Sequence, residues 1–141
     1  MDDMIFTGRC NCGAVRYTAQ GPQLFGVLCH CRDCQRASGS GHVPIMGVAA
    51  TGFAVTGTTR STTMTGSSGM DAVRHFCGGC GSLLFGTPEA APMMATIYAG
   101  SLDNPALFRA DAAQFVRSRP VWDVGAATLP EFDTTPPMQD T

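Results

Sequence analysis

Three cysteines, Cys29, Cys31 and Cys34, lie within the segment CHCRDC at positions 29–34. Thiolates are preferred zinc ligands. A zinc ion held by three protein groups keeps a fourth position for water or substrate, whereas a structural zinc ion usually has four protein ligands. The segment is therefore predicted to bind a catalytic zinc ion, with all three thiols at the reaction centre.

The remaining four cysteines form two closely spaced pairs. Cys10 and Cys12 make a C-x-C pair near the start of the chain, and Cys77 and Cys80 make a C-x-x-C pair past its middle. Two sulfurs on one tetrahedral zinc ion lie about 3.8 Å apart, which both spacings allow. We expect these four residues to bind a structural zinc ion. A second partition, in which Cys77 joins the cysteines of segment 29–34, stays open.

The number and type of reactive side chains limit the chemistry. Seven cysteines would leave one thiol unpaired in a disulfide framework, while one four-ligand site and one three-ligand site use them all. Every basic residue is Arg, so a lysine Schiff base is excluded and a thiolate or a metal-bound hydroxide must act as nucleophile. Clustered thiols of this kind are typical of metal sites in a reducing compartment, and we expect a cytoplasmic protein.

Several polar side chains are candidates for binding a substrate beside segment 29–34. A guanidinium can hold a carboxylate through two parallel hydrogen bonds, and serine hydroxyls can add further donors. Asp33 could relay a proton. In an extended segment His30 points away from the metal. Because seven thiols are available as ligands, none of the three histidines is predicted to bind zinc. The substrate-binding candidates are Arg32, Arg36, Arg74, Ser38 and Ser40.

The segments that must position these groups have the pattern of an all-β protein. Short apolar or alternating stretches are separated by glycine-containing turns, and long helical periodicity is absent. One helical turn is expected after Cys34, ended by glycines. Residues 1–8 are interpreted as a lead-in and 66–69 as a hairpin tip. The predicted strands are 14–19, 24–28, 42–50, 53–56, 58–64, 71–76, 82–86, 93–99 and 113–116.

Size and charge exclude some function classes. The 141 residues suit a single domain, predicted over 1–133, with a Pro-rich, polar and disordered tail over 134–141. The net charge is −2 and no basic run is present, which argues against nucleic acid and membrane surfaces as partners. We expect a monomer or homodimer whose partner is a small thiol.

Five motifs in order, GRCNCGAVRY, CHCRDCQRASGS, RHFCGGCGSLLF, AGSLD and SRPVW, resemble the glutathione-dependent formaldehyde-activating enzyme family, which includes centromere protein V. The resemblance implies a β-tent of several coiled antiparallel sheets with short helical turns. It also implies that the outer cysteine pairs hold structural zinc, that segment 29–34 holds catalytic zinc, and that glutathione and formaldehyde are the substrates.

Three functions are consistent with these motifs. The first is a zinc-dependent carbon–sulfur lyase or synthase that forms or cleaves an adduct between a small thiol, such as glutathione, and an aldehyde, such as formaldehyde. The second is a non-enzymatic zinc module that carries or senses a thiol, a metal or a partner protein. The third is a redox-sensing thiol cluster that holds little metal.

Overall fold

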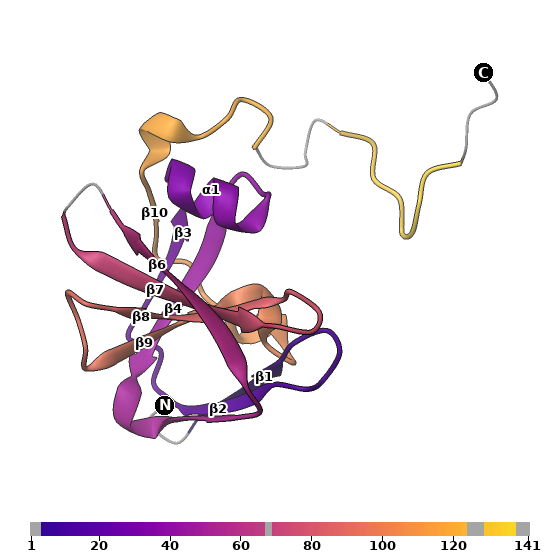
Figure 1. Cartoon of the computed structure of the whole chain (residues 1–141). Coiled ribbons are helices and arrows are strands. Elements are labelled where there is room, and N and C mark those ends of the chain that lie inside the picture. The colour runs from indigo at the N-terminus through magenta and orange to yellow at the C-terminus, as the bar shows by residue number, and fades with distance from the viewer. Residues whose placement is uncertain (1–3, 67–68, 124–128, 138–141) are drawn as a thin grey trace.

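The computed structural model describes residues 4–66, 69–123 and 129–137, and this part of the chain is mainly β, which confirms the predicted fold class (Figure 1). Most strands lie within two residues of their predicted positions. The strands are β1 Ile5–Arg9, β2 Arg16–Gln20, β3 Phe25–Cys29, β4 Val43–Ala49, β5 Phe53–Thr56, β6 Thr59–Thr65, β7 Asp71–Cys77, β8 Leu83–Pro88, β9 Met94–Tyr98 and β10 Ala112–Gln114. The α-helix, α1, spans Arg32–Ser38, and four short 3-10 turns occupy Ala50–Gly52, Ala99–Ser101, Pro105–Leu107 and Val116–Ser118.

The strands form two sheets. A three-stranded sheet has the order β1-β2-β5, and a seven-stranded sheet has the order β10-β3-β4-β9-β8-β7-β6. All pairings are antiparallel except that of β10 with β3, which is parallel. The expectation of purely antiparallel sheets therefore fails at this one edge, where a late segment returns to lie beside an early strand.

The interpretation of residues 1–8 as a lead-in is wrong, because Ile5–Arg9 is strand β1. It pairs with β2 over its whole length, and every second residue is buried. Only Phe6 is a large buried side chain in this strand, since the other inward position is Gly8. With one inward-facing apolar side chain, next to the exposed apolar Ile5, the segment lacks the alternation that indicates a strand.

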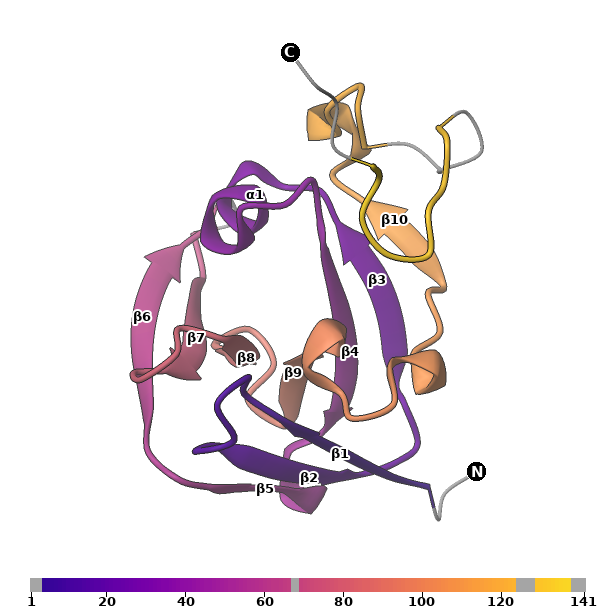
Figure 2. The same cartoon turned by 90° about the vertical axis from the view of Figure 1, so that its right-hand side faces the viewer.

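The hydrophobic core lies between the two sheets. Phe6 and Tyr17 from the three-stranded sheet join Met46, Leu84 and Ile97 from the seven-stranded sheet in one buried cluster. Figure 2 shows β1, β2 and β5 crossing one end of the larger sheet, which curves around this interior. Burial of these side chains supplies the main favourable term in the stability of the domain.

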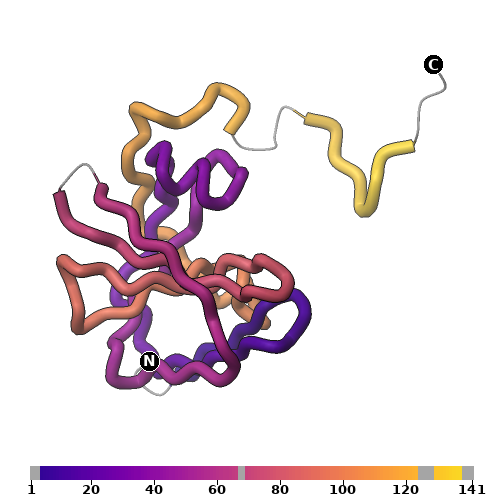
Figure 3. The backbone as a smooth tube through the Cα atoms, in the orientation of Figure 1, coloured from indigo at the N-terminus to yellow at the C-terminus, as the bar shows by residue number. Residues whose placement is uncertain are grey.

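The chemistry-bearing segment lies at the other end of the larger sheet. Strand β3 ends at Cys29, helix α1 follows, and Gly39, with a φ of 70°, ends the helix in the left-handed conformation. Strand β4 then returns antiparallel to β3. Figure 3 shows the segment around β10 running beside this turn, where Gln114 is the register partner of Cys29. Strands β3 and β10, which are far apart in sequence, thus lie side by side next to α1.

The last described residues, 129–137, are exposed, contain no helix or strand, and extend away from the sheets in Figure 1. The predicted hairpin tip at 66–69 and the predicted disordered tail at 134–141 fall partly on residues 67–68 and 138–141, which lie outside the described residues. The part of the chain that the structure describes contains no helix with the length and apolar character that a membrane span requires.

Replacing Met46 with Ala is expected to lower the free energy of unfolding by about 2–5 kcal/mol, because its side chain is 0% exposed and its loss leaves a cavity. The matched control is Met93→Ala, at a methionine that is 65% exposed, which should change stability by less than about 0.5 kcal/mol. Urea denaturation of both variants measures the difference. Equal effects would contradict a core centred on β4.

Candidate metal centres

Cys10, Cys12, Cys77 and Cys80 come together at the junction of the two sheets. The first pair follows β1. In the second pair, Cys77 is the last residue of β7 and Cys80 lies in the turn between β7 and β8. The Sγ atoms of Cys10 and Cys12 are 3.6 Å apart, and those of Cys12 and Cys77 are 3.7 Å apart. All four sulfurs lie within 4.8 Å of one another. This group, called the quartet below, has the spacing that one tetrahedral metal ion requires. Cys77 therefore lies in the quartet.

Backbone amides stabilise the quartet sulfurs. The Val15 amide donates to Cys10 Sγ at 3.3 Å, and the Gly79 and Cys80 amides donate to Cys77 Sγ at 3.4 and 3.5 Å. Hydrogen bonds to the charged form of a group favour that form, so these donors favour the thiolates that a metal needs. All seven cysteines of the chain are free thiols.

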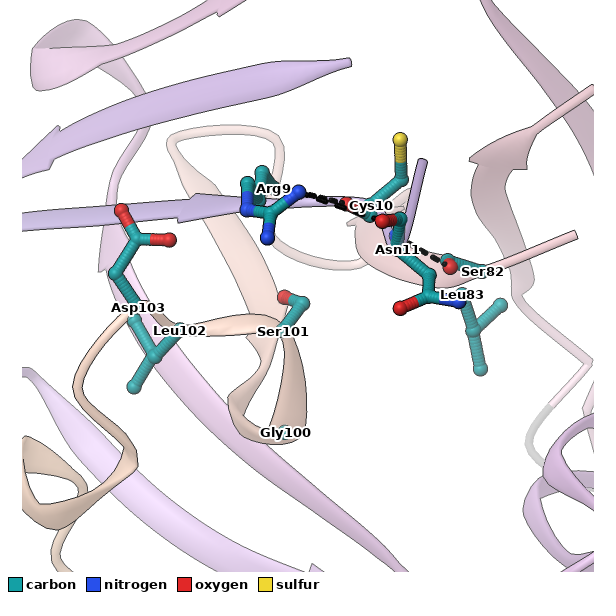
Figure 4. A pocket seen from close by; sticks show the side chains of 9 residues that line it. All are labelled: Arg9, Cys10, Asn11, Ser82, Leu83, Gly100, Ser101, Leu102 and Asp103. Atoms are coloured by element: carbon teal, nitrogen blue, oxygen red, sulfur yellow. Dashed lines mark hydrogen bonds between the residues drawn. The ribbon is translucent and has the colours of Figure 1, made fainter. Parts of the chain in front are cut away.

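A cavity of about 460 Å³ lies next to the quartet (Figure 4). The side chains of Arg9, Ser82 and Asp103 already have partners within the fold. Asp103 accepts a hydrogen bond from the Thr7 hydroxyl at 2.8 Å. The backbone amide of Asn11 donates to Ser82 Oγ at 2.9 Å, and Arg9 donates to the backbone carbonyl of Asn11 at 3.3 Å. We assign these contacts to the support of the quartet loop.

Cys29, Cys31 and Cys34 form the second sulfur group, called the trio below. Their sulfurs lie within 4.8 Å of one another, with Cys29 and Cys34 buried and Cys31 partly exposed. The geometry follows from the helix start. Cys31 is the N-cap of α1, and its Sγ accepts a hydrogen bond from the Cys34 amide at 3.3 Å. The helical turn thus folds two of the sulfurs onto the end of β3.

Within the trio the buried thiols influence each other's ionisation. The hydrogen bond from Cys34 lowers the pKa of Cys29 to about 5, and the same interaction together with burial raises the pKa of Cys34. Three adjacent thiolates repel one another in a poorly solvated site, so they require a compensating cation. This donor set fits a divalent metal ion, for which three sulfurs provide three of four tetrahedral ligands.

Arg74 is the positive group beside the trio. It projects from β7, is only 8% exposed, and donates from Nη2 to Cys34 Sγ at 3.7 Å. Burial disfavours its charge, but the bond to Cys34 and the neighbouring Tyr98 and sulfurs raise its pKa. Its Nη1 is buried with no hydrogen-bond partner among the described residues. One buried donor is therefore free beside the sulfurs.

A second cavity, of about 310 Å³, opens directly onto Cys31 and Cys34. Among the described residues that line it, Arg74 is the only cationic one, and the carboxylates are Asp33 and Asp71. Asp71 accepts a hydrogen bond from the Thr65 hydroxyl at 2.6 Å, while Asp33 stands in the first turn of α1. The wall is otherwise largely apolar. Its apolar residues include Ile45, Met64, Ala72, Pro88, Ala90 and Phe115.

The other substrate-binding candidates do not line this cavity. Arg32 donates a hydrogen bond to Gln35 within the helix, and Arg36 is exposed in its last turn. Ser38 Oγ donates to the Cys34 carbonyl at 2.8 Å, and Ser40 Oγ donates to the His42 carbonyl at 3.0 Å. The structure thus brings Arg74 and Asp33 to the trio cavity and places the remaining four around the outside of α1.

Two aromatic residues at the cavity were not among the predicted site residues. Tyr98, at the end of β9, is buried, which raises its pKa to about 12 and keeps it a neutral donor at physiological pH. Phe115 follows β10 and adopts φ 55°, ψ 37°. This left-handed conformation ends the strand, so β10 stops at Gln114, two residues before the predicted end of strand 113–116. Nothing in the local sequence distinguishes an aromatic residue that lines a cavity from one that packs in the core.

The fold and the two sulfur groups define a mainly-β domain with two cysteine clusters whose spacing suits metal ions. The model of the family described as glutathione-dependent formaldehyde-activating enzyme matches residues 5–118. The chain belongs to this family, which confirms the resemblance seen in the sequence motifs.

One solved structure shares the fold. The crystal structure of a Rhodobacter sphaeroides protein is 21% identical in sequence, covers 77% of this chain and 99% of its own, and gives a TM-score of 0.57. A likeness at this identity supports the architecture alone. The comparison with curated proteins found no match.

The two sulfur groups should respond differently to loss of a ligand. Cys77→Ser should lose metal at the quartet and unfold the domain, because the quartet joins the two sheets across 65 residues between Cys12 and Cys77. The matched variant Cys31→Ser should lose the trio metal but keep the fold. Circular dichroism and metal analysis of the purified variants distinguish them. A folded Cys77→Ser protein with unchanged stability would contradict the structural role.

Proposed function

We propose that the quartet binds a structural zinc ion, that the trio binds a catalytic zinc ion, and that the protein is a carbon–sulfur lyase acting on adducts of a small thiol and an aldehyde. Membership of the formaldehyde-activating family supports the reaction class. The observation that carries the proposal is the sulfur trio, which has three ligands and faces a cavity. A closed four-ligand site would leave no position for a substrate.

The reaction is an addition to a carbonyl and its reverse. In the forward direction the sulfur of the thiol bonds to the carbonyl carbon, the C=O double bond becomes a C–O single bond, and the thiol proton ends on oxygen. No oxidant or reductant is needed. When bound, zinc at the trio would stabilise the substrate thiolate at neutral pH, while three protein thiolates keep that sulfur electron-rich.

Arg74 and Tyr98 are placed to stabilise charge during this addition. The free Nη1 of Arg74 and the neutral hydroxyl of Tyr98 are donors at the cavity wall, and negative charge develops on the former carbonyl oxygen. Fixed donors aimed at a developing oxyanion lower the barrier, especially where water is excluded. Arg74 also donates to Cys34, so its guanidinium is held in place before substrate enters.

Asp33 is positioned to move the proton. It lines the cavity from the first turn of α1, two residues beyond Cys31, and no hydrogen bond occupies its carboxylate among those found in the described structure. A carboxylate within reach of both the thiol and the solvent can accept the thiol proton and pass it to the product hydroxyl. This role is compatible with its partly solvated position.

The cavity also indicates the kind of thiol. Glutathione, the thiol in the family's description, carries two carboxylates, whereas the described wall offers Arg74 as its sole cation. The peptide ends of glutathione would therefore lie at the rim, towards Arg32 and Arg36 on the outer face of α1. A small thiol adduct with an apolar substituent would fill the interior more completely.

The reaction is tested by exchange NMR of glutathione with formaldehyde. Wild-type protein should accelerate interconversion of the free thiol and its hydroxymethyl adduct, and Cys31→Ser should reduce the rate to the uncatalysed value. Met93→Ala serves as a control with unchanged rate. If the wild-type protein binds both zinc ions yet accelerates neither this adduct nor one of an apolar thiol, the lyase proposal fails and a thiol-sensing module is favoured.

Arg74→Met should lower kcat/KM by roughly 10- to 100-fold, since loss of a hydrogen bond to a charged group costs about 1.5–3 kcal/mol. Arg16→Met, at an exposed arginine of β2, is the matched control. Zinc content is measured in parallel, so that loss of metal is separated from loss of the donor. An unchanged rate in fully loaded Arg74→Met protein would remove Arg74 from the mechanism.

A further inference from the structure

A third cluster of potential metal ligands lies on the far side of the trio segment. His30 Nδ1 is 3.1 Å from Asp123 Oδ2, and His42 Nδ1 is 2.8 Å from the same oxygen. The two imidazole rings are tilted, with centroids 5.0 Å apart. One ligand atom from each residue lies within 4.8 Å of the others. Two imidazoles and a carboxylate thus converge on a single point.

His30 is the least expected member of the cluster, because it is 2% exposed and neither ring nitrogen makes a hydrogen bond within the described structure. Its contact with Asp123 is short, but the carboxylate lies off the direction in which the ring nitrogen could donate. A buried polar atom without a partner costs on the order of 1–3 kcal/mol. A ligand on Nδ1 would offset part of this cost.

The spacing fits a small divalent ion. Zinc lies about 2.0–2.1 Å from imidazole nitrogen and about 2.0–2.2 Å from carboxylate oxygen, so ligand atoms around it are roughly 3.3 Å apart. The Asp123 Oδ2 separations are shorter than this value by about 0.2 Å for His30 and about 0.5 Å for His42, whose contact is a hydrogen bond, so both would lengthen slightly around an ion. A carboxylate with two neutral imidazoles also leaves positions for water, as in the open sites of transition metals.

The surrounding contacts hold His30 and Asp123 independently of any ion. The His30 amide donates to the Gln114 carbonyl at 3.0 Å, and Gln35 Nε2 donates to the His30 and Ser118 carbonyls at 2.8 and 2.9 Å. Asp123 packs directly over Gly41, where an added Cβ would lie 2.6 Å from the carboxylate. His30 and Asp123, which are far apart in sequence, are therefore held around one small space.

We propose that His30, His42 and Asp123 form a third metal site, for a divalent first-row transition metal such as zinc, separate from the two sulfur groups. Because its donors are nitrogen and oxygen, this site has a different ligand chemistry from the quartet and the trio. A cation there would also lie beside the negatively charged trio, since His30 stands between Cys29 and Cys31. The proposal is independent of the lyase function.

Cobalt titration of the reduced, metal-free full chain separates the sites. Cobalt bound to sulfur gives a charge-transfer absorption, whereas cobalt bound to nitrogen and oxygen does not. Equilibrium dialysis measures total bound cobalt, and the excess over the sulfur-bound amount reports the third site. We expect one excess equivalent in wild-type protein and none in Asp123→Asn or His42→Gln, with the sulfur absorption unchanged in both.

Gly41→Ala gives a second test that removes no ligand. The added methyl group would displace the Asp123 carboxylate, so the affinity of the excess equivalent should fall by at least about 10-fold, as when a supporting contact of a metal ligand is lost. Zinc competition against the cobalt-loaded protein measures this affinity. The proposal is overturned if wild-type protein binds no cobalt beyond the sulfur-bound amount, or if the excess equivalent survives in both ligand variants.

Discussion

The meeting of four sulfurs from two distant loops is the constraint on which the rest of the structure depends. Cys10 and Cys12 follow a strand of the smaller sheet. Cys77 ends strand β7 of the larger sheet, and Cys80 lies in the turn that leads to β8. Their sulfur separations of 3.6 and 3.7 Å leave room for an ion and not for a disulfide. The hydrophobic core lies between two sheets that meet at this point.

The opposite end of the larger sheet has different physical requirements. There the chain must bury two thiols, leave a third accessible, and keep a guanidinium next to them. A strand that runs directly into a seven-residue helix meets these demands, because the helix cap folds the sulfurs together and Arg74 projects from β7 to their side. The parallel β10 closes the outer edge and carries Phe115 to the cavity wall. The two sulfur groups thus lie at separate ends of one sheet.

Much of this arrangement could be predicted from the sequence, for reasons that differ between elements. The spacing of the cysteines is a local signal, and so are the glycine-bounded apolar runs that became β4, β5 and β7. Strand β1 was missed because Gly8 takes the inward place of a second apolar side chain. Tyr98, Phe115 and the convergence of His30 with Asp123 depend on pairings between distant segments, which no local pattern encodes. Arg74 was one of three arginines proposed to hold a carboxylate, and it lines the cavity because it projects from β7. Arg32 and Arg36 lie on α1 and do not line the cavity.

Phe115 links the shape of the cavity to the cost of its own backbone. A left-handed conformation at a residue with a bulky side chain costs on the order of 1–2 kcal/mol, which the surrounding contacts must offset. Glycine at this position would remove the backbone cost and widen the cavity, whereas another aromatic residue would keep the backbone cost and the present width of the cavity. The width of this cavity therefore depends on a single exposed residue of the C-terminal segment, and not on the packed core of the domain.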